Sequence, residues 1–112
     1  MPDNKKNGLM GPSRVSRPAD LVEYSEGSTV SRIVMKSSNG SVTLFSFDRG
    51  QNLSEHTTNF DALVEVIDGE GEFIIDGTAH NVAAGNMLIL PAGIPHAVNA
   101  AKRFKMLLTM LR

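Results

Sequence analysis

The chain has 112 residues, a formal net charge of −1 and no cysteine. This length fits one domain with a small core. The lack of cysteine excludes disulfides and thiolate metal sites, and the near-zero charge gives no electrostatic signal for nucleic-acid binding. No apolar run approaches the ~20 residues that a membrane span needs, and the basic start lacks the apolar core of a signal peptide. We therefore expect a cytoplasmic protein that binds neither nucleic acid nor membranes.

The first 18 residues differ in composition from the rest of the chain. They are rich in Asn, Lys, Gly, Ser and Pro and show no periodicity, which predicts a flexible N-terminal tail over residues 1–18. Residues 19–112 are then the single folded domain. Asp20–Tyr24, at its start, is short and mixed in character and is a candidate edge strand.

Short β-branched and apolar runs follow. Val30–Lys36 and Ser41–Phe47 flank Asn39-Gly40, a strong signal for a hairpin turn. The remaining runs predict strands at Leu63–Ile67, Glu72–Ile75, Thr78–Val82, Met87–Leu90 and from Phe104 to Met110, with turns at Asp68–Gly71 and Asp76-Gly77. No segment shows convincing helix periodicity, so the pattern indicates an all-β sandwich or barrel.

Val42–Phe47 has apolar residues in both of its alternating sets. A strand of this kind is covered on both faces, either by a second sheet or by a partner subunit. Cover by a partner subunit would make the protein a homodimer, which is an expectation that sedimentation tests.

One stretch combines an apolar strand with rigid turn residues and a histidine. Met87–Leu90 is followed by Pro91 and Gly93, which force a turn, and Pro95 fixes the backbone just before His96. This spacing resembles the second motif of the cupin superfamily, at Gly85, Pro91, Gly93 and His96.

A degenerate first cupin motif lies upstream, with Gly50, His56 and Gly69 at the matching positions. Thr58 stands where that motif has its second histidine, and Ala62 where it has its glutamate. The two motifs cover roughly residues 40–100. The resemblance implies an all-β cupin β-barrel, of the jelly-roll or RmlC-like type.

In the cupin family, three histidines and one glutamate usually hold a metal on the inner wall of the barrel. Only His56 and His96 remain at those positions here. The resemblance implies that these two side chains face one cavity, next to Thr58 and Ala62, and that they are the ligands of any bound divalent metal: Zn, Ni, Fe or Mn. No cofactor at all is the alternative.

Nearby carboxylates do not replace the missing glutamate. Successive side chains of a strand point to opposite faces, so Asp61 and Glu65 face outward if Ala62 faces inward. Only a β-bulge would re-aim Asp61. Glu55, next to His56, points away from it for the same reason.

His80 is the third histidine. A two-residue turn at Asp76-Gly77 places Phe73 opposite His80, and a four-residue turn at Asp68–Gly71 places Val66 opposite Phe73. His80 then points inward, but ~13 Å along the strand from the level of Ala62. We interpret it as a core or pocket-floor histidine rather than a ligand.

These observations predict a small-molecule-binding cupin, with or without a weakly held metal. A metal-dependent enzyme of the dioxygenase or isomerase type, using His56 and His96, is the alternative, and metal-free acid–base catalysis by one histidine is a third. The fold alone does not decide whether the chain is an enzyme. The missing inward carboxylate favours binding.

Overall fold

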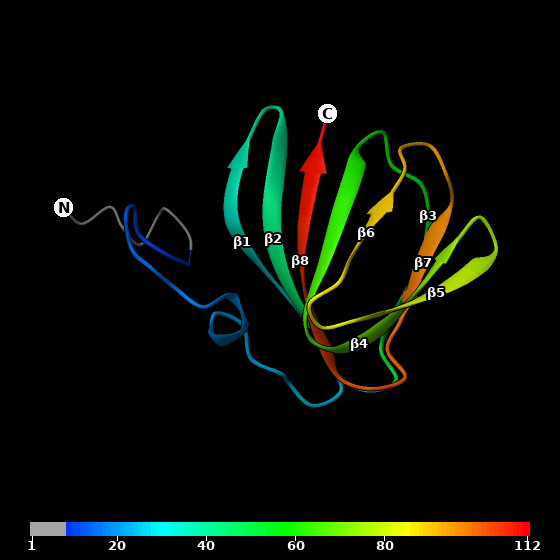
Figure 1. Ribbon diagram of the computed structural model, residues 1–112, viewed down its shortest axis with the longest axis horizontal. Coiled ribbons are helices and arrows are strands. Elements are labelled where there is room, and N and C mark those ends of the chain that lie inside the picture. The colour runs from blue at the N-terminus through cyan, green and yellow to red at the C-terminus, as the bar shows by residue number, and fades with distance from the viewer. Residues whose placement is uncertain (1–8) are drawn as a thin grey trace.

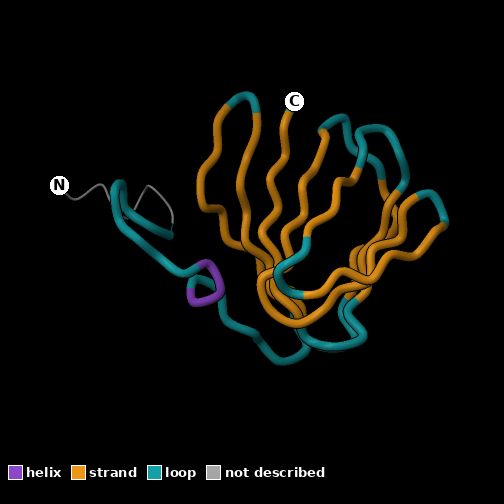
Figure 2. The backbone as a smooth tube through the Cα atoms, in the orientation of Figure 1, coloured by secondary structure: helices purple, strands orange, loops and turns teal. Residues whose placement is uncertain are grey.

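The computed structural model describes residues 9–112, so the first eight residues of the expected tail lie outside the described part of the chain. The described residues form a curled antiparallel β-sheet and a single 3-10 turn, η2 (Pro18–Asp20) (Figures 1 and 2). The strands are β1 (Thr29–Ser37), β2 (Gly40–Phe47), β3 (Asn52–His56), β4 (Asp61–Ile75), β5 (Thr78–Ala83), β6 (Met87–Leu90), β7 (His96–Asn99) and β8 (Phe104–Leu111). The all-β prediction is confirmed. Within residues 9–112, no helix is long and apolar enough to cross a membrane.

Strand β4 belongs to two walls of the curled sheet. Its first part pairs with β6 and β8, and β8 pairs in turn with β2 and β2 with β1. We call these strands the five-stranded wall. The second part of β4 pairs with β5 and β7, and β7 pairs with β3, which makes the four-stranded wall. Figure 1 shows the two walls diverging from the bend of β4.

The predicted turn at Asp68–Gly71 is wrong, because β4 runs through it as one strand of 15 residues. The register of β4 on β8 shifts between Val66 and Asp68, as at a β-bulge. A Cβ on Gly71 would lie 2.6 Å from the Phe104 ring. The glycines therefore mark a bend with close packing rather than a hairpin, and Val66 pairs with Met106 instead of lying opposite Phe73.

Aromatic rings join the two walls in the core. The Phe104 ring stacks on the Phe47 ring with centroids 4.6 Å apart, and it meets the Phe73 ring edge-on at 5.9 Å. All three side chains are fully buried. Phe47 and Phe104 lie in the five-stranded wall and Phe73 in the four-stranded wall, so this cluster holds the walls against each other.

The segment that precedes β1 crosses the outer face of the five-stranded wall. We call residues 18–28 the strap. The Ser46 hydroxyl donates a hydrogen bond to the Glu23 carbonyl (2.8 Å), and the Lys105 ammonium donates one to the Ala19 carbonyl (2.6 Å). Val22 of the strap is fully buried.

The strap corrects one expectation and bears on a second. Asp20–Tyr24 is not an edge strand, because its contacts are made by side chains across the sheet face rather than by strand pairing. On the second face of β2, Leu44 and Ser46 are fully buried within the single chain, and Ser46 bonds the chain's own N-terminal segment. The homodimer stays a prediction.

Candidate functional site

The histidine pair is built on β3 and β7, at the edge of the four-stranded wall. His56 is the last residue of β3 and His96 the first of β7, and the register places them opposite each other. Val98, two residues after His96, is buried in the core. Since side chains two residues apart share a face, both histidines lie on the core-facing side of the wall.

The two imidazole rings are in contact. Their centroids are 4.4 Å apart and their planes are inclined by 66°. His96 is buried, with 4% of its surface exposed, whereas His56 is exposed. One ring therefore belongs to the interior of the barrel and the other borders solvent.

Backbone carbonyls fix the tautomer of each ring. The Nδ1 atom of His56 lies 2.7 Å from the Ser54 carbonyl oxygen, and the Nδ1 atom of His96 lies 3.1 Å from the Ile94 carbonyl oxygen. Because a carbonyl oxygen only accepts, each Nδ1 carries the hydrogen and donates it. In the neutral rings, both Nε2 atoms then keep a lone pair for a metal ion or for a hydrogen-bond donor.

Burial lowers the pKa of His96 from its ordinary value. The hydrogen bond to the Ile94 carbonyl opposes this shift, and the nearby His56 adds to it. The neutral form of His96 is therefore favoured, which is the form that can donate a lone pair.

Thr58 and Ala62, which stand at the two remaining ligand positions of the first motif, make contacts that stabilise the fold. Neither is shown to act as a ligand. The Thr58 hydroxyl accepts a hydrogen bond from the Phe60 amide at 2.7 Å. Ala62 is buried in the core and pairs with Leu90. Asp61 is exposed, and its carboxylate accepts a hydrogen bond from the Ala92 amide at 3.0 Å. No bulge turns Asp61 toward the histidines.

The remaining acidic candidates also stand apart from the pair. Glu55 is exposed, and Glu65 pairs with Leu107 in the five-stranded wall, out of phase with the buried Val64. Across residues 9–112, no group of three or more His, Asp or Glu side chains is arranged to hold a metal ion. The donor set is therefore two imidazoles, short of the three protein ligands of a typical catalytic zinc site.

His80 lies on the same core-facing side but not in contact with the pair. The turn at Asp76-Gly77 is confirmed, and Phe73 pairs with His80 as predicted. His96 pairs with Ile75, on the opposite edge of β4 and two residues further along it. The buried Nδ1 atom of His80 has no hydrogen-bond partner within the described chain.

The carbonyl groups of Ser54 and Ile94 are the site components that sequence analysis missed. Each precedes its histidine by two residues. Every residue carries a backbone carbonyl, so no residue type could have marked these two. The two residues share only their position, two places before a histidine, and this likeness could be noticed only after both histidines had been assigned to the site.

The comparisons with known proteins agree with this fold. A conserved protein of unknown function from Streptococcus pyogenes is 32% identical, with a TM-score of 0.88 over 93% of this chain and 91% of that one. A cupin 2 conserved barrel domain protein from Leptotrichia buccalis is 43% identical, with a TM-score of 0.82 over 84% of this chain and 46% of that one.

A more distant fold match is the salicylate 1,2-dioxygenase from Pseudaminobacter salicylatoxidans, which is 14% identical, with a TM-score of 0.68 over 75% of this chain and 26% of that one. No curated protein matches the chain. The profile of the Cupin domain family matches residues 43–110. With the barrel, the two motif histidines and this match together, the chain belongs to the cupin family.

Proposed function

We propose that this cupin binds a small molecule at the histidine pair, with a divalent metal ion held weakly between the protein and that molecule. The observation that supports the proposal is the shared tautomer of His56 and His96. Both rings donate through Nδ1 to a backbone carbonyl, which leaves both Nε2 atoms available. The ring centroids lie only 4.4 Å apart, so one ion or molecule bound beside the pair would be within reach of both rings.

The residues present suit such a divalent ion only in part. Imidazole is a good ligand for zinc, nickel and iron, but two imidazoles leave most of the coordination shell to water or to the bound molecule. A ligand with a carboxylate or neighbouring hydroxyl groups would supply those donors. His96 is buried and His56 is exposed, so the molecule would approach from the side of His56.

A metal-dependent enzyme of the dioxygenase or isomerase type is the second candidate. Its support is the fold shared with the salicylate dioxygenase, and a shared fold hosts many chemistries. Ala62 and Asp61 count against it. Ala62 offers no donor atom, and the Asp61 carboxylate is engaged by the Ala92 amide, so neither position supplies a ligand or general base beside the pair.

The test compares three single variants of untagged protein. After dialysis against Zn²⁺, Ni²⁺ or Mn²⁺ in turn, bound metal is measured by elemental analysis. His56→Ala and His96→Ala should each lose metal uptake, because one imidazole is too few donors for retention. His80→Ala is the matched control and should keep it, because His80 pairs with Phe73 across β4. Equal loss in His80→Ala, or full uptake in His56→Ala, would contradict the proposal.

A further inference from the structure

Six apolar side chains on the inner faces of the two walls are only half-buried, although they pack against the core. They are Phe45, Leu53, Ile75, Leu88, Leu108 and Met110. Along β8, Met110 and Leu108 are half-buried, whereas Met106 and Phe104, nearer the bend, are 1% and 0% exposed. The open end of the barrel, where β4 begins and ends, therefore leaves apolar surface uncovered.

The flanking strands show where this uncovered surface lies. Leu108 and Met110 belong to β8, which has β2 on one side and β4 on the other. Ile75 belongs to the part of β4 that lies between β5 and β7. Solvent therefore reaches these three side chains from the open end and from the space between the walls, which diverge in that direction in Figure 1. Because Ile75 pairs with His96, the uncovered surface adjoins the histidine pair.

The paired residues on the inner faces of the described strands include no carboxylate. On β4, the acidic side chains fall in the alternate rows, out of phase with the buried Val64 and Phe73, as at Glu65 and Glu72. Two neutral imidazoles leave the charge of a divalent ion uncompensated, and carboxylate oxygen is a common third ligand. A negative ligand for such an ion would therefore come from the bound molecule.

We propose that the molecule bound at the histidine pair is an apolar carboxylic acid. Its carboxylate lies beside His56 and His96, and its hydrocarbon body covers Ile75, Leu108 and Met110. This inference rests on the proposed function, because it takes the pair as the binding site. Sugars and polyols fit the same surface poorly, because their hydroxyl groups would lose water against side chains that offer no hydrogen bonds.

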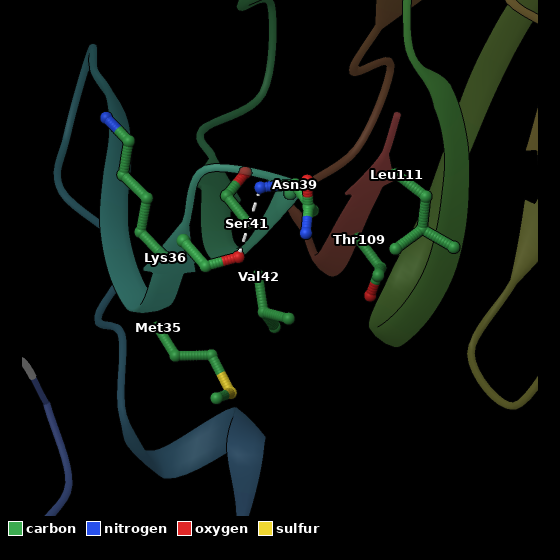
Figure 3. Close-up of a pocket in the computed structure, with 9 residues that line it drawn as sticks. Met35, Lys36, Asn39, Ser41, Val42, Thr109 and Leu111 are labelled. Carbon is green, nitrogen blue, oxygen red and sulfur yellow. Dashed lines mark hydrogen bonds between the residues drawn. The ribbon is translucent and has the colours of Figure 1, made fainter.

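A second apolar recess lies on the other face of the five-stranded wall. This hollow of about 220 Å³ is lined by Met35, Val42, Leu111 and neighbouring residues (Figure 3). Successive side chains of β2 point to opposite faces, so Val42 and Thr43 lie on different sides of the wall. The hollow is therefore separate from the histidine pair, and it is the competing place for an apolar probe.

Two carboxylic acids of equal chain length and charge test the ligand class. Hexanoate and gluconate are titrated in turn into isotopically labelled parent protein at one fixed Zn²⁺ concentration, and amide shifts are followed by NMR. Hexanoate should bind at least about tenfold more tightly, because its methylene groups leave water. Its shifts should centre on Ile75, His96 and Leu108. Gluconate binding as tight as that of hexanoate, or hexanoate shifts confined to Met35 and Val42, would overturn the inference.

Two neighbouring leucines provide matched variants. Leu107 and Leu108 are both half-buried on β8 but lie on opposite faces, because Leu108 pairs with the buried Val64 and Leu107 with Glu65. Leu108→Asn should weaken hexanoate binding about tenfold, whereas Leu107→Asn should leave it unchanged. Equal effects of the two substitutions would contradict a hydrocarbon body between the walls. The comparison of the two acids on the parent protein needs no variant and stands even if Leu108→Asn does not fold.

His96→Ala separates this inference from the proposed function. Loss of hexanoate binding together with loss of zinc uptake supports both. Zinc uptake that depends on His96, in a protein with no preference for hexanoate, overturns the apolar acid and leaves the pair as the binding site. Hexanoate binding that persists in His96→Ala overturns the pair as the binding site, and the inference with it.

Discussion

The two walls of the barrel share strand β4 but differ in the residues on their outer faces. On the five-stranded wall, the outward row contains Met35, Leu63 and Ile89. On the four-stranded wall, one outward row is polar and runs through Asn81, Glu72, Asn99 and Asn52, with a hydrogen bond from the Asn99 amide to the Glu72 carboxylate, while the next outward row consists of Ala79, Ile74 and Ala97. The four-stranded wall thus presents a polar row to solvent, whereas the five-stranded wall is partly covered by the strap.

This difference separates two properties of the molecule. The four-stranded wall carries the histidine pair on its inner side, and the five-stranded wall carries the strap on its outer side. Substitutions at the histidine pair should therefore change metal binding, and substitutions in the strap should change stability. The following predictions test whether binding and stability depend on different walls.

The largest effect is expected at the junction of the walls. Phe104→Ala should lower the free energy of unfolding by about 4 kcal/mol, because it removes a buried ring and leaves a cavity. Its ring touches Phe47 in one wall and Phe73 in the other. Urea unfolding followed by circular dichroism measures the loss. A change below about 1 kcal/mol would mean that the walls do not depend on this cluster.

A smaller effect is expected from the strap. Val22→Ala should cost about 2 kcal/mol, because the fully buried side chain loses apolar contact with the five-stranded wall. Metal uptake at the histidine pair should stay unchanged, since the strap lies on the other wall. Denaturant unfolding and elemental analysis of the same sample check both statements. Loss of metal without loss of stability would contradict the separation of the walls.

The smallest effect is a pH dependence of the strap. Hydrogen bonds from the Gly27 amide and the Arg103 guanidinium lower the pKa of Asp48 from 3.8 to about 2. The unfolded chain therefore binds this proton at higher pH than the folded chain does. The stabilisation is complete above pH 3.8 and is lost as pH falls through about 2.

Asp48→Asn provides the comparison. The gap in unfolding free energy between parent and variant should be constant above pH 4 and should shrink between roughly pH 4 and pH 2. Urea titrations at half-unit pH steps measure it. A gap that does not narrow in this range would mean that the Gly27 and Arg103 contacts do not stabilise the carboxylate in solution.

Sequence analysis was most successful where hydrophobic pattern and turn chemistry agree. The β1–β2 hairpin, β6 and β8 are examples, although the hairpin turn lies at Ser38-Asn39, one residue before the predicted Asn39-Gly40. Strand β3 was missed because it is polar, with only Leu53 partly buried among its five residues. The bend of β4 was mistaken for a turn because closely spaced glycines such as Gly69 and Gly71 are typical of both a hairpin turn and a bent strand. What distinguishes them is the Phe104 ring, which comes from a strand 33 residues later in the chain.

The candidate site was only partly visible in the sequence. Motif spacing selected His56 and His96, and the register of β3 on β7 places them opposite each other. The tautomers, by contrast, depend on carbonyl directions at Ser54 and Ile94, which follow from backbone torsions in the folded state. The position of the strap could not be predicted either, because Ala19 bonds Lys105, which lies 86 residues later in the sequence.

The order of strands sets the timing of folding during synthesis. Strand β8 lies between β2 and β4, so the five-stranded wall stays in two pieces until residues 104–111 have left the ribosome. Until then, the hairpin of β1 and β2 has an open edge and an uncovered apolar face. Long-range pairings of this kind are slow and prone to aggregation. A nascent chain without residues 104–111 outside the ribosome would be a substrate for chaperones, whereas one in which they have emerged would already hold its complete wall.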